Sequence, residues 1–262
     1  MDLGLTGKVA LVCGASRGIG YATAEEFVRE GASLVICSRD EGAITAAAAK
    51  LAGFGTKVVG VAADLSIEAG LSTAIERAKG AFGQIDVLVT NTGGPPVHAP
   101  MEPDWAAYTR ASELLLRSVI ELTRAFVPGM RKRKWGRVVG ITSLAVKQPV
   151  KGLVLTNAFR AAVTGYLRTL AEDVASDGVT VNTVLPGLTD TDRLRSLADT
   201  AAKQQGSTRE AIYDRYRADT PARRLGTADE IASVITFLAS TRAAFVTGQA
   251  ILVDGGTVRA LL

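Results

Sequence analysis

The hydrophobic positions of the chain fall into short continuous runs separated by longer periodic segments. The short runs are rich in Val, Ile and Leu and are apolar at nearly every position. They lie at residues 8–13, 33–37, 57–61, 85–90, 137–142, 179–184 and 250–254. Strands that are apolar on both faces are typical of a parallel sheet buried between two layers of helices. The runs therefore predict about seven strands of such a sheet.

The segments between these runs carry helical periodicity and are rich in Ala, Leu, Glu and Arg. They lie at residues 18–30, 40–53, 66–82, 104–131, 156–177 and 227–240. Strands that alternate with helices favour right-handed crossovers and a doubly wound sheet. The pattern predicts a Rossmann-type α/β fold with helices on both faces of a parallel sheet.

Residues 1–262 are expected to form a single domain, because no linker or internal repeat divides them. The longest irregular stretch, 186–226, begins with Pro186-Gly187 and contains a polar helical segment near 190–218. Connections at the carboxyl edge of a parallel sheet commonly carry binding groups. We interpret 186–226 as a lid over a substrate.

The composition is that of a globular protein, with 47% hydrophobic and 21% charged residues. The formal net charge of +4 is too small and too scattered to indicate a nucleic-acid partner. The densest basic run, 131–134, has two interpretations. It either contacts a phosphate or an acidic carrier protein, or it is the solvated end of a helix whose dipole favours cations.

Cys13 and Cys37 are the two cysteines of the chain. They are too few for a disulfide framework or a zinc site, so we expect two reduced, buried thiols and no metal. The N-terminus has no apolar signal core, and no stretch approaches the ~18 apolar residues that span a bilayer. A cytoplasmic location without a membrane partner is the resulting expectation.

The first predicted strand runs directly into the segment Gly14-Ala-Ser-Arg-Gly18-Ile-Gly20, after which a helix begins. Glycines permit a tight turn and let backbone amides approach a pyrophosphate, which the positive helix N-terminus stabilises. A strand before the turn and a helix after it are the context that makes this spacing specific. The sequence therefore predicts a dinucleotide site that includes Gly14, Ser16, Arg17, Gly18, Ile19 and Gly20.

The end of the second predicted strand distinguishes NAD from NADP, because an acid that binds the adenosine ribose diol normally lies there. This chain has Ser38 and Arg39 instead. Arg39, together with Arg17, can pair with a 2′-phosphate. Asp40 comes one residue later and is interpreted as the cap of the next helix. NADP(H) is the expected cofactor.

Further motifs follow the remaining strands in order. They are Asp64-Leu65, Asn91-Thr-Gly-Gly94, Ile141-Thr-Ser143, Pro186-Gly187 with Thr191, and Val246–Gly256. With the glycine turn, they make nearly the whole chain resemble the short-chain dehydrogenase/reductase family, and within it the 3-oxoacyl-acyl-carrier-protein reductase-like branch. The resemblance implies that Asp64 binds the adenine amino group and that Asn91 secures the central strand, and it adds Leu65 and Gly93 to the cofactor-binding residues. It also implies that the nicotinamide end is held by Pro186, Gly187, Thr189 and Thr191.

The resemblance further implies hydride transfer between a nicotinamide and a carbonyl or alcohol, with a Tyr as proton donor and a Lys four residues later. A Ser polarises the carbonyl, and an Asn on the fourth helix completes a proton relay. Ser143 stands at the Ser position, but the Tyr and Lys positions hold Thr156 and Arg160. The Asn position falls near Leu115, after an apparent short insertion in the fourth helix.

Thr156 is a much weaker acid than Tyr, and Arg160 can bind a ribose but cannot exchange a proton at working pH. We therefore expect an atypical active site made of Ser143, Thr156 and Arg160, with Arg160 also binding the cofactor. The proton would come from water or from a lid residue. Other groups near the expected site are more typical of surface positions. They are His98, Lys147, Lys151, Tyr213 and Tyr216.

Two functions remain open from the sequence. One is an NADP(H)-dependent oxidoreductase that acts on a small carbonyl or alcohol substrate. The other is a nucleotide-binding or interaction protein that keeps the fold and has lost the reaction, since a fold and a cofactor site do not establish activity. The resemblance and the apolar C-terminal tail, 258–262, predict a homo-oligomer, specifically a tetramer.

Overall fold

The computed structural model describes residues 2–261 and contains one parallel sheet of seven strands. The strand order is β3-β2-β1-β4-β5-β6-β7, and every neighbouring pair is parallel. The strands are β1 (Val9–Cys13), β2 (Ser33–Ser38), β3 (Val58–Ala62), β4 (Val87–Thr90), β5 (Gly136–Ile141), β6 (Val179–Pro186) and β7 (Ala250–Val253). The predicted Rossmann-type fold is confirmed, with strand ends that differ from the prediction by two residues at most.

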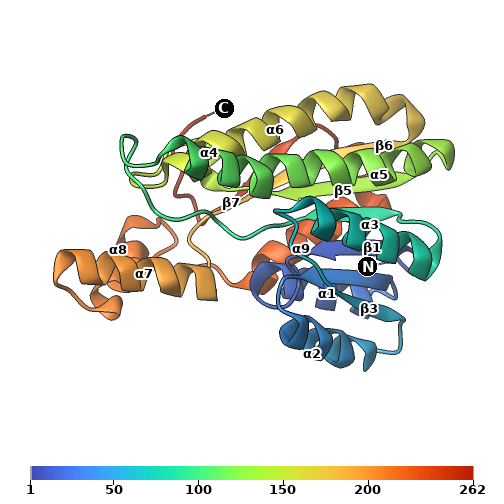
Figure 1. Ribbon diagram of the computed structural model, residues 1–262, viewed down its shortest axis with the longest axis horizontal. Helices are drawn as coiled ribbons and strands as arrows, with labels where there is room; N and C mark the ends of the chain where they lie inside the picture. The colour runs from blue at the N-terminus through green and yellow to red at the C-terminus, as the bar shows by residue number, and fades with distance from the viewer. Residues whose placement is uncertain (1, 262) are drawn as a thin grey trace.

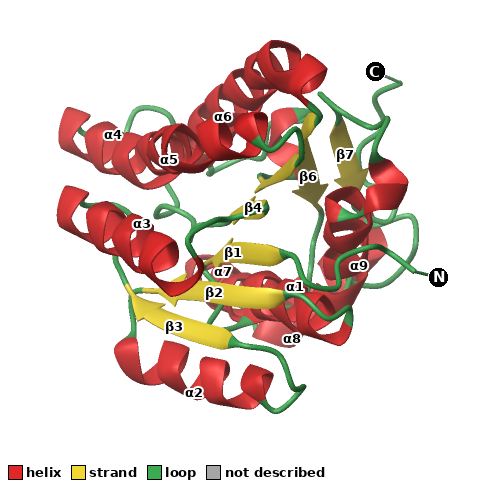
Figure 2. Cartoon of the chain, turned by 90° about the vertical axis from the view of Figure 1, so that its right-hand side faces the viewer, coloured by secondary structure: helices red, strands yellow, loops and turns green. Residues whose placement is uncertain are grey.

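Helices cover both faces of the sheet (Figure 2). One face is covered by α3 (Glu68–Phe82), α5 (Ser118–Lys132) and α6 (Val154–Val174), with α4 (Trp105–Ser112) leading into α5. The other face is covered by α1 (Gly18–Arg29), α2 (Glu41–Ala52) and α9 (Ala228–Ala239). The two layers leave the carboxyl ends of the strands free, which is where ligands bind in such folds.

Each face of the sheet has its own hydrophobic core, as alternation along a strand requires. In β1, Leu11 and Cys13 pack toward α3, α5 and α6, whereas Ala10 and Val12 pack toward α1, α2 and α9. These four side chains are completely buried. The position of the central strand is therefore fixed from both sides, and so is the turn that follows it.

The fourth helical segment differs from its prediction as one continuous helix over 104–131. The structure has α4, then a π-helical turn η1 (Glu113–Arg117), and then α5. The Ser118 hydroxyl donates a hydrogen bond of 2.6 Å to the carbonyl oxygen of Leu114 inside this turn. A π-helical turn accommodates one extra residue without ending a helix, which explains the apparent insertion in the sequence.

The polar segment expected near 190–218 is two helices, α7 (Asp192–Gln205) and α8 (Arg209–Asp219). Gly206 ends α7 in the left-handed region at φ 59°, and the Thr208 side chain caps the start of α8. A small core of its own, with Leu194 and Ile212 at its centre, joins the two helices. They extend from the edge of the main body as an arm (orange in Figure 1).

Three of the four cations in the basic run 131–134 form ion pairs within the chain at the end of α5. Arg131 and Lys134 both pair with Asp177, and Arg133 pairs with Asp86. These contacts favour the interpretation as a helix end over a separate anion site. The connections of the fold also contain short 3-10 turns, which are η2 (Leu144–Val146), η3 (Ala175–Asp177) and η4 (Thr241–Ala243).

Cys13 and Cys37 are free and buried, as predicted, and they are paired neighbours in the register of β1 and β2. A hydrogen bond with Cys37 and burial raise the pKa of the Cys13 thiol. Both thiols therefore belong to the hydrophobic core. Across residues 2–261, no helix has the length and apolar character needed to cross a membrane.

Candidate active site

A cavity of about 590 Å³ opens at the carboxyl ends of the central strands. It lies where the chain order of the sheet reverses, between β1 and β4, the usual ligand position of a doubly wound sheet. Four loops line it, those that follow β1, β2, β3 and β4. They bring together these predicted cofactor residues: Gly14, Ser16, Arg17, Ser38, Arg39, Asp64, Leu65, Asn91 and Gly93.

The turn after β1 has the backbone shape that its glycines predict. Gly14 and Gly18 have φ values of 60° and 59°, in the left-handed region. A side chain at Gly20 would collide with the carbonyl oxygen of Gly14. The Asn91 side chain donates a hydrogen bond of 3.4 Å to that same oxygen, which joins the loop after β4 to the turn. No side chain caps the start of α1, so its first amides are available to a phosphate.

The end of β2 presents a cation to the cavity while its nearest acid is engaged elsewhere. Asp40 accepts a hydrogen bond of 2.7 Å from the Ala43 amide and caps α2, as predicted. The Arg39 side chain is exposed at the cavity. Burial acts to raise the pKa of Asp64, but hydrogen bonds from Ser66 and the charge of Arg39 lower it overall. This part of the cavity is suited to an additional phosphate.

Arg17 connects the glycine turn to the arm. Its guanidinium lies 3.3 Å from the carboxylate of Asp192, in the first turn of α7, and both side chains are largely exposed. A hydrogen bond from Arg195 is the main cause that lowers the pKa of Asp192, and the charges of Arg195 and Arg17 add to it. An exposed pair of this kind is weak, so Arg17 remains free to exchange Asp192 for a phosphate.

Ser143 and Thr156 lie at the start of the elements that follow β5. Ser143 follows the end of β5, and its hydroxyl accepts a hydrogen bond of 3.1 Å from the Ala145 amide. Thr156 is buried in the first turn of α6. The loop between them is fixed by the Asn157 side chain, which bonds both the amide and the carbonyl of Val150.

Arg160 is the best-fixed side chain of the predicted catalytic set, and 8% of it is exposed. Its Nη1 donates 2.7 Å to the carbonyl of Ile141, and its Nη2 donates 3.1 Å to the carbonyl of Thr92. It therefore holds the end of β5 against the loop after β4. Burial, and then the charge of Arg193, lower the pKa of Arg160 to about 10. At neutral pH it remains a cation and a hydrogen-bond donor.

The predicted relay position contains no polar side chain. Leu115 is completely buried, and Leu114, which precedes it, lines the cavity. The π-helical turn thus presents an apolar side chain to the cavity. The nearby Tyr166 hydroxyl is 2.7 Å from the hydroxyl of Thr123 and packs in the core between α5 and α6.

The wall beside Ser143 is formed by two loops that pair with each other. His98 forms a bridge to Leu153, and its amide donates 2.8 Å to the carbonyl of Gly152. The His98 ring lies 3.8 Å from the carboxylate of Glu102. Lys147 and Lys151 lie on this wall and are exposed.

The base of the arm is a series of short local contacts. Pro186 is the last residue of β6, and the Gly187 amide donates 2.9 Å to the carbonyl of Val253. The Thr189 hydroxyl bonds the carbonyl of Gly187, and the Thr191 hydroxyl bonds that of Thr189 and caps α7. The segment Pro186–Thr191, which is predicted to hold the nicotinamide, is therefore fixed by local hydrogen bonds, and we call it the shelf.

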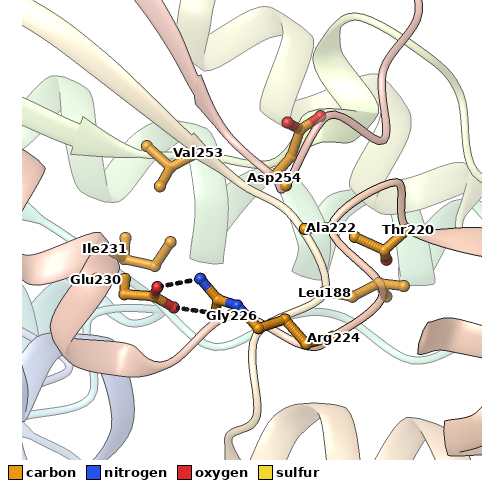
Figure 3. A pocket seen from close by; sticks show the side chains of 10 residues that line it. Leu188, Thr220, Ala222, Arg224, Gly226, Glu230, Ile231, Val253 and Asp254 are labelled. Carbon is orange, nitrogen blue, oxygen red and sulfur yellow. Dashed lines mark hydrogen bonds and ion pairs between the residues drawn. The ribbon is translucent and has the colours of Figure 1, made fainter.

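A second, smaller cavity of about 100 Å³ lies behind this shelf (Figure 3). Arg224 forms two hydrogen bonds with Glu230 across it, of 2.8 and 2.6 Å. Glu230 also completes a capping box with Thr227 at the start of α9. Hydrogen bonds from Arg224 and Thr227 lower the pKa of Glu230 to about 2. The hydrogen-bonded pair of Arg224 and Glu230 in this cavity therefore anchors the end of the arm.

Tyr213 and Tyr216 pack within the arm. The Tyr213 hydroxyl donates 3.2 Å to Asp190, and its ring lies 6.3 Å from that of Tyr216. Burial is the main cause that raises the pKa of both phenols. In residues 2–261, no group of three His, Cys, Asp or Glu side chains is arranged to hold a metal ion.

Sequence reasoning missed one polar residue of the site, Arg193. It lies in the first turn of α7, and its Nη2 donates 2.7 Å to the carbonyl of Pro95, across the mouth of the cavity. A basic residue in the first turn of a helix interacts unfavourably with the helix dipole. Its position two residues after Thr191, at the start of a predicted helix, was therefore a signal in the sequence that Arg193 has another role.

Known proteins match this chain over nearly its whole length. A family model described as enoyl-(acyl carrier protein) reductase matches residues 14–258. The 3-oxoacyl-[acyl-carrier-protein] reductase FabG of Escherichia coli (strain K12) is 35% identical over 250 residues, which cover 95% of this chain and 97% of that protein.

Solved structures give the same result. L-Sorbose reductase from Gluconobacter frateurii, complexed with NADPH and L-sorbose, has a TM-score of 0.95 at 34% identity and matches 100% of both chains. A variant of actinorhodin polyketide ketoreductase with NADPH has a TM-score of 0.92 at 30% identity, covering 97% of this chain and 98% of that one. With its fold, its glycine turn and these relatives, the chain belongs to the short-chain dehydrogenase/reductase family of oxidoreductases.

Proposed function

We propose that this protein is an NADP(H)-dependent oxidoreductase that interconverts a small carbonyl compound and its alcohol. The choice of NADP(H) as the cofactor is based on the end of β2. There, Arg39 faces the cavity while Asp40 is engaged as a helix cap. A 2′-phosphate gains a charge-assisted contact with Arg39 at this position, whereas Asp40, which also lines the cavity, is held by the Ala43 amide as the helix cap. Residues 1–262 act as one domain, with 186–226 as its substrate lid.

The residues of the cavity fit the cofactor along its length. The amides of the glycine turn would hold the pyrophosphate, with Ser16, Gly18 and Ile19 closest to it. Asp64 and Leu65 would contact the adenine. Asn91 and Gly93 would form the floor beneath the central part of the cofactor. The shelf would hold the nicotinamide through Pro186, Gly187, Thr189 and Thr191.

NADPH, when bound, supplies the hydride that the carbonyl carbon accepts, and the carbonyl oxygen takes a proton to give the alcohol. In this chain, the Ser143 hydroxyl would position that oxygen by a hydrogen bond. Arg160 would hold the cofactor ribose from its fixed place under the loop after β4. Thr156 would add a second hydrogen bond. The proton would come from water or from a lid residue, since neither Thr156 nor Arg160 titrates near neutral pH.

A second candidate function is nucleotide binding or interaction without turnover. The observation that favours it is the apolar relay position, where Leu115 is buried and Leu114 faces the cavity. The defined shelf at Pro186–Thr191 favours the enzyme, because a protein that only binds a nucleotide gains little from an ordered nicotinamide end.

One experiment distinguishes the oxidoreductase from the protein that only binds a nucleotide. The protein is titrated with NADPH by fluorescence, and the same sample is then assayed with a broad panel of carbonyl compounds and alcohols. The oxidoreductase predicts both saturable binding and turnover of a subset of the panel. Binding with no turnover favours the second function, and the absence of binding contradicts both.

We also propose that the protein is a homotetramer. Val258 is nearly buried while Leu261 is fully exposed, so the tail after β7 leaves the body with an apolar end. Leu262, the last residue of the expected tail, lies outside the described residues. Light scattering at micromolar protein should give a mass near four times 27.3 kDa, and a mass of 27.3 kDa would contradict the tetramer.

A further inference from the structure

Two guanidinium groups from different elements meet the same loop. Arg160 of α6 donates 3.1 Å to the carbonyl of Thr92, and Arg193 of α7 donates 2.7 Å to the carbonyl of Pro95. The Arg193 guanidinium lies directly over Gly94, where a Cβ atom would be 2.7–3.0 Å from three of its atoms. The two cations therefore converge on residues 92–95, at the edge of the large cavity.

The positive charge at this place is not compensated by the chain. Within residues 2–261, no carboxylate lies within ion-pair distance of either arginine. The nearest acids of the arm, Asp190 and Asp192, pair with Arg195 and Arg17 instead. The charge of Arg193 adds to burial in lowering the pKa of Arg160. Two neighbouring cations without a carboxylate are unfavourable unless a ligand supplies the negative charge.

The pair lies behind the loop after β4, next to the elements that carry Ser143 and Thr156. Arg160 is one helical turn after Thr156, and its other hydrogen bond goes to Ile141, two residues before Ser143. The glycine turn and Arg39, which suit the phosphates of a dinucleotide, follow β1 and β2 instead. A ligand group held by Arg193 beside Arg160 would thus be near the reacting carbonyl rather than near the cofactor phosphates.

The accessibility of the two side chains differs in a way that suits a ligand. Arg160 is buried and fixed, whereas Arg193 is exposed and belongs to the arm. A guanidinium presents a planar set of donors that matches a carboxylate or phosphate. Arg193 also stands in the first turn of α7, whose dipole favours an anion. A ligand from solvent can meet Arg193 and draw it from Pro95.

We propose that Arg193 binds an anionic group, a carboxylate or a phosphate, carried by the carbonyl substrate itself, and that the neighbouring charge of Arg160 strengthens this binding. The proposal rests on the proposed function. It narrows the substrate class from carbonyl compounds in general to carbonyl compounds that carry a carboxylate or a phosphate group. The same anion chemistry also occurs in the cofactor phosphates, so the test has to separate these two sources.

The test is calorimetric titration of the protein with malonate and with inorganic phosphate, each with and without saturating NADP⁺. The variants are Arg193→Gln, the charge-conserving Arg193→Lys, and Arg215→Gln as a matched control. Arg215 is an exposed arginine of the same arm whose side chain bonds Gln205. All three substitutions are at exposed positions, so the fold should be retained.

The expected result is that at least one probe binds the NADP⁺-loaded protein. Arg193→Gln should weaken that binding about tenfold or more, Arg193→Lys should recover part of it, and Arg215→Gln should leave it unchanged. The affinity for NADP⁺ should be the same in all forms. A failure of both probes to bind, or equal binding by Arg193→Gln, would overturn the proposal.

Loss of probe binding on addition of NADP⁺, together with weaker NADP⁺ binding by Arg193→Gln, would assign the pair to the cofactor phosphates and also overturn it. The outcome is independent of turnover, because binding alone is measured. If the protein fails to bind NADP⁺, the proposed function fails, while the titration without cofactor still reports on the anion site.

Discussion

The turn after β1 and the helix after β5 both lie at the carboxyl edge of the sheet, but their proposed contributions to binding differ. The turn acts through its backbone: two glycines in the left-handed region, a third that admits no side chain, and free amides at the start of α1. The helix would act through its side chains Thr156 and Arg160, beside the leucines of the π-helical turn.

This difference shows which part of a site a fold determines. A backbone cradle is specified by strand register and by a few glycines, so it follows once the sheet is formed. Side-chain chemistry is chosen position by position on the same backbone, because a helix accepts Thr or Tyr and Arg or Lys with little change in shape. The cofactor half can thus be retained while the reaction half is rebuilt.

The largest expected effect comes from exchanging the side chains of the reaction half. Thr156→Tyr with Arg160→Lys should raise kcat/KM for a generic 3-oxoacyl substrate by about 10²-fold or more, since general acid catalysis contributes about 10²–10⁴. The two changes should not add, because the lysine tunes the phenol. Steady-state kinetics of both single variants and of the double variant measure this.

The matched control is Thr156→Phe with Arg160→Lys, which adds the ring without its hydroxyl and should gain nothing. If the native protein reduces its substrate well, and the double variant binds NADPH but loses that activity, the native side chains have a chemistry of their own.

The next largest effect is on the free energy of unfolding. It concerns Arg160, which joins the end of β5 to the loop after β4. Arg160→Met would leave the carbonyls of Ile141 and Thr92 without their donor inside the protein, which should cost about 2–3 kcal/mol of unfolding free energy. Urea denaturation measures the change. Arg168→Met is the control on the same helix; its exposed pair with Glu172 should contribute less than about 1 kcal/mol. Equal losses for the two variants would show that Arg160 does not hold the loops together.

A smaller effect is expected on the cofactor half. The protein should bind NADPH about tenfold or more tightly than NADH, and Arg39→Gln should remove most of that preference by weakening NADPH alone. Isothermal titration with both cofactors at one salt concentration measures it. Lys50→Gln, which removes a cation from the last turn of α2, should leave both affinities unchanged. Equal affinities of the native protein for NADPH and NADH would contradict the role of Arg39.

The smallest effect concerns the anchor of the arm. Glu230 has its pKa lowered to about 2 in the folded protein, whereas an unfolded Glu titrates near 4.5. Its stabilising contribution is therefore complete above about pH 5 and is lost as the pH falls toward 2. Glu230→Gln should flatten the acid limb of the stability curve, measured by thermal melting between pH 3 and 7. Glu172→Gln, an exposed acid of α6, should leave that limb unchanged.

The sequence predicts the sheet and the shape of the glycine turn well, because hydrophobic runs and glycine spacing are local signals. It does not reveal the π-helical turn at Glu113–Arg117, since the segments on both sides of it are helical and an apparent insertion does not show how the backbone accommodates it. The break at Gly206 was hidden in a polar segment without strong periodicity. The contacts of Arg160 and Arg193 go to backbone carbonyls that are distant in sequence, and no sequence pattern marks a carbonyl as a partner.

The most direct measurement follows the hydride itself. The native protein is incubated with NADPH deuterated at both C4 positions and with a panel of neutral and anionic carbonyl compounds, and the alcohols are examined by mass spectrometry. An oxidoreductase built on this site should place deuterium on the carbinol carbon of at least one product. Tight NADPH binding with no deuterated alcohol from any compound would contradict the reaction and leave a nucleotide-binding protein.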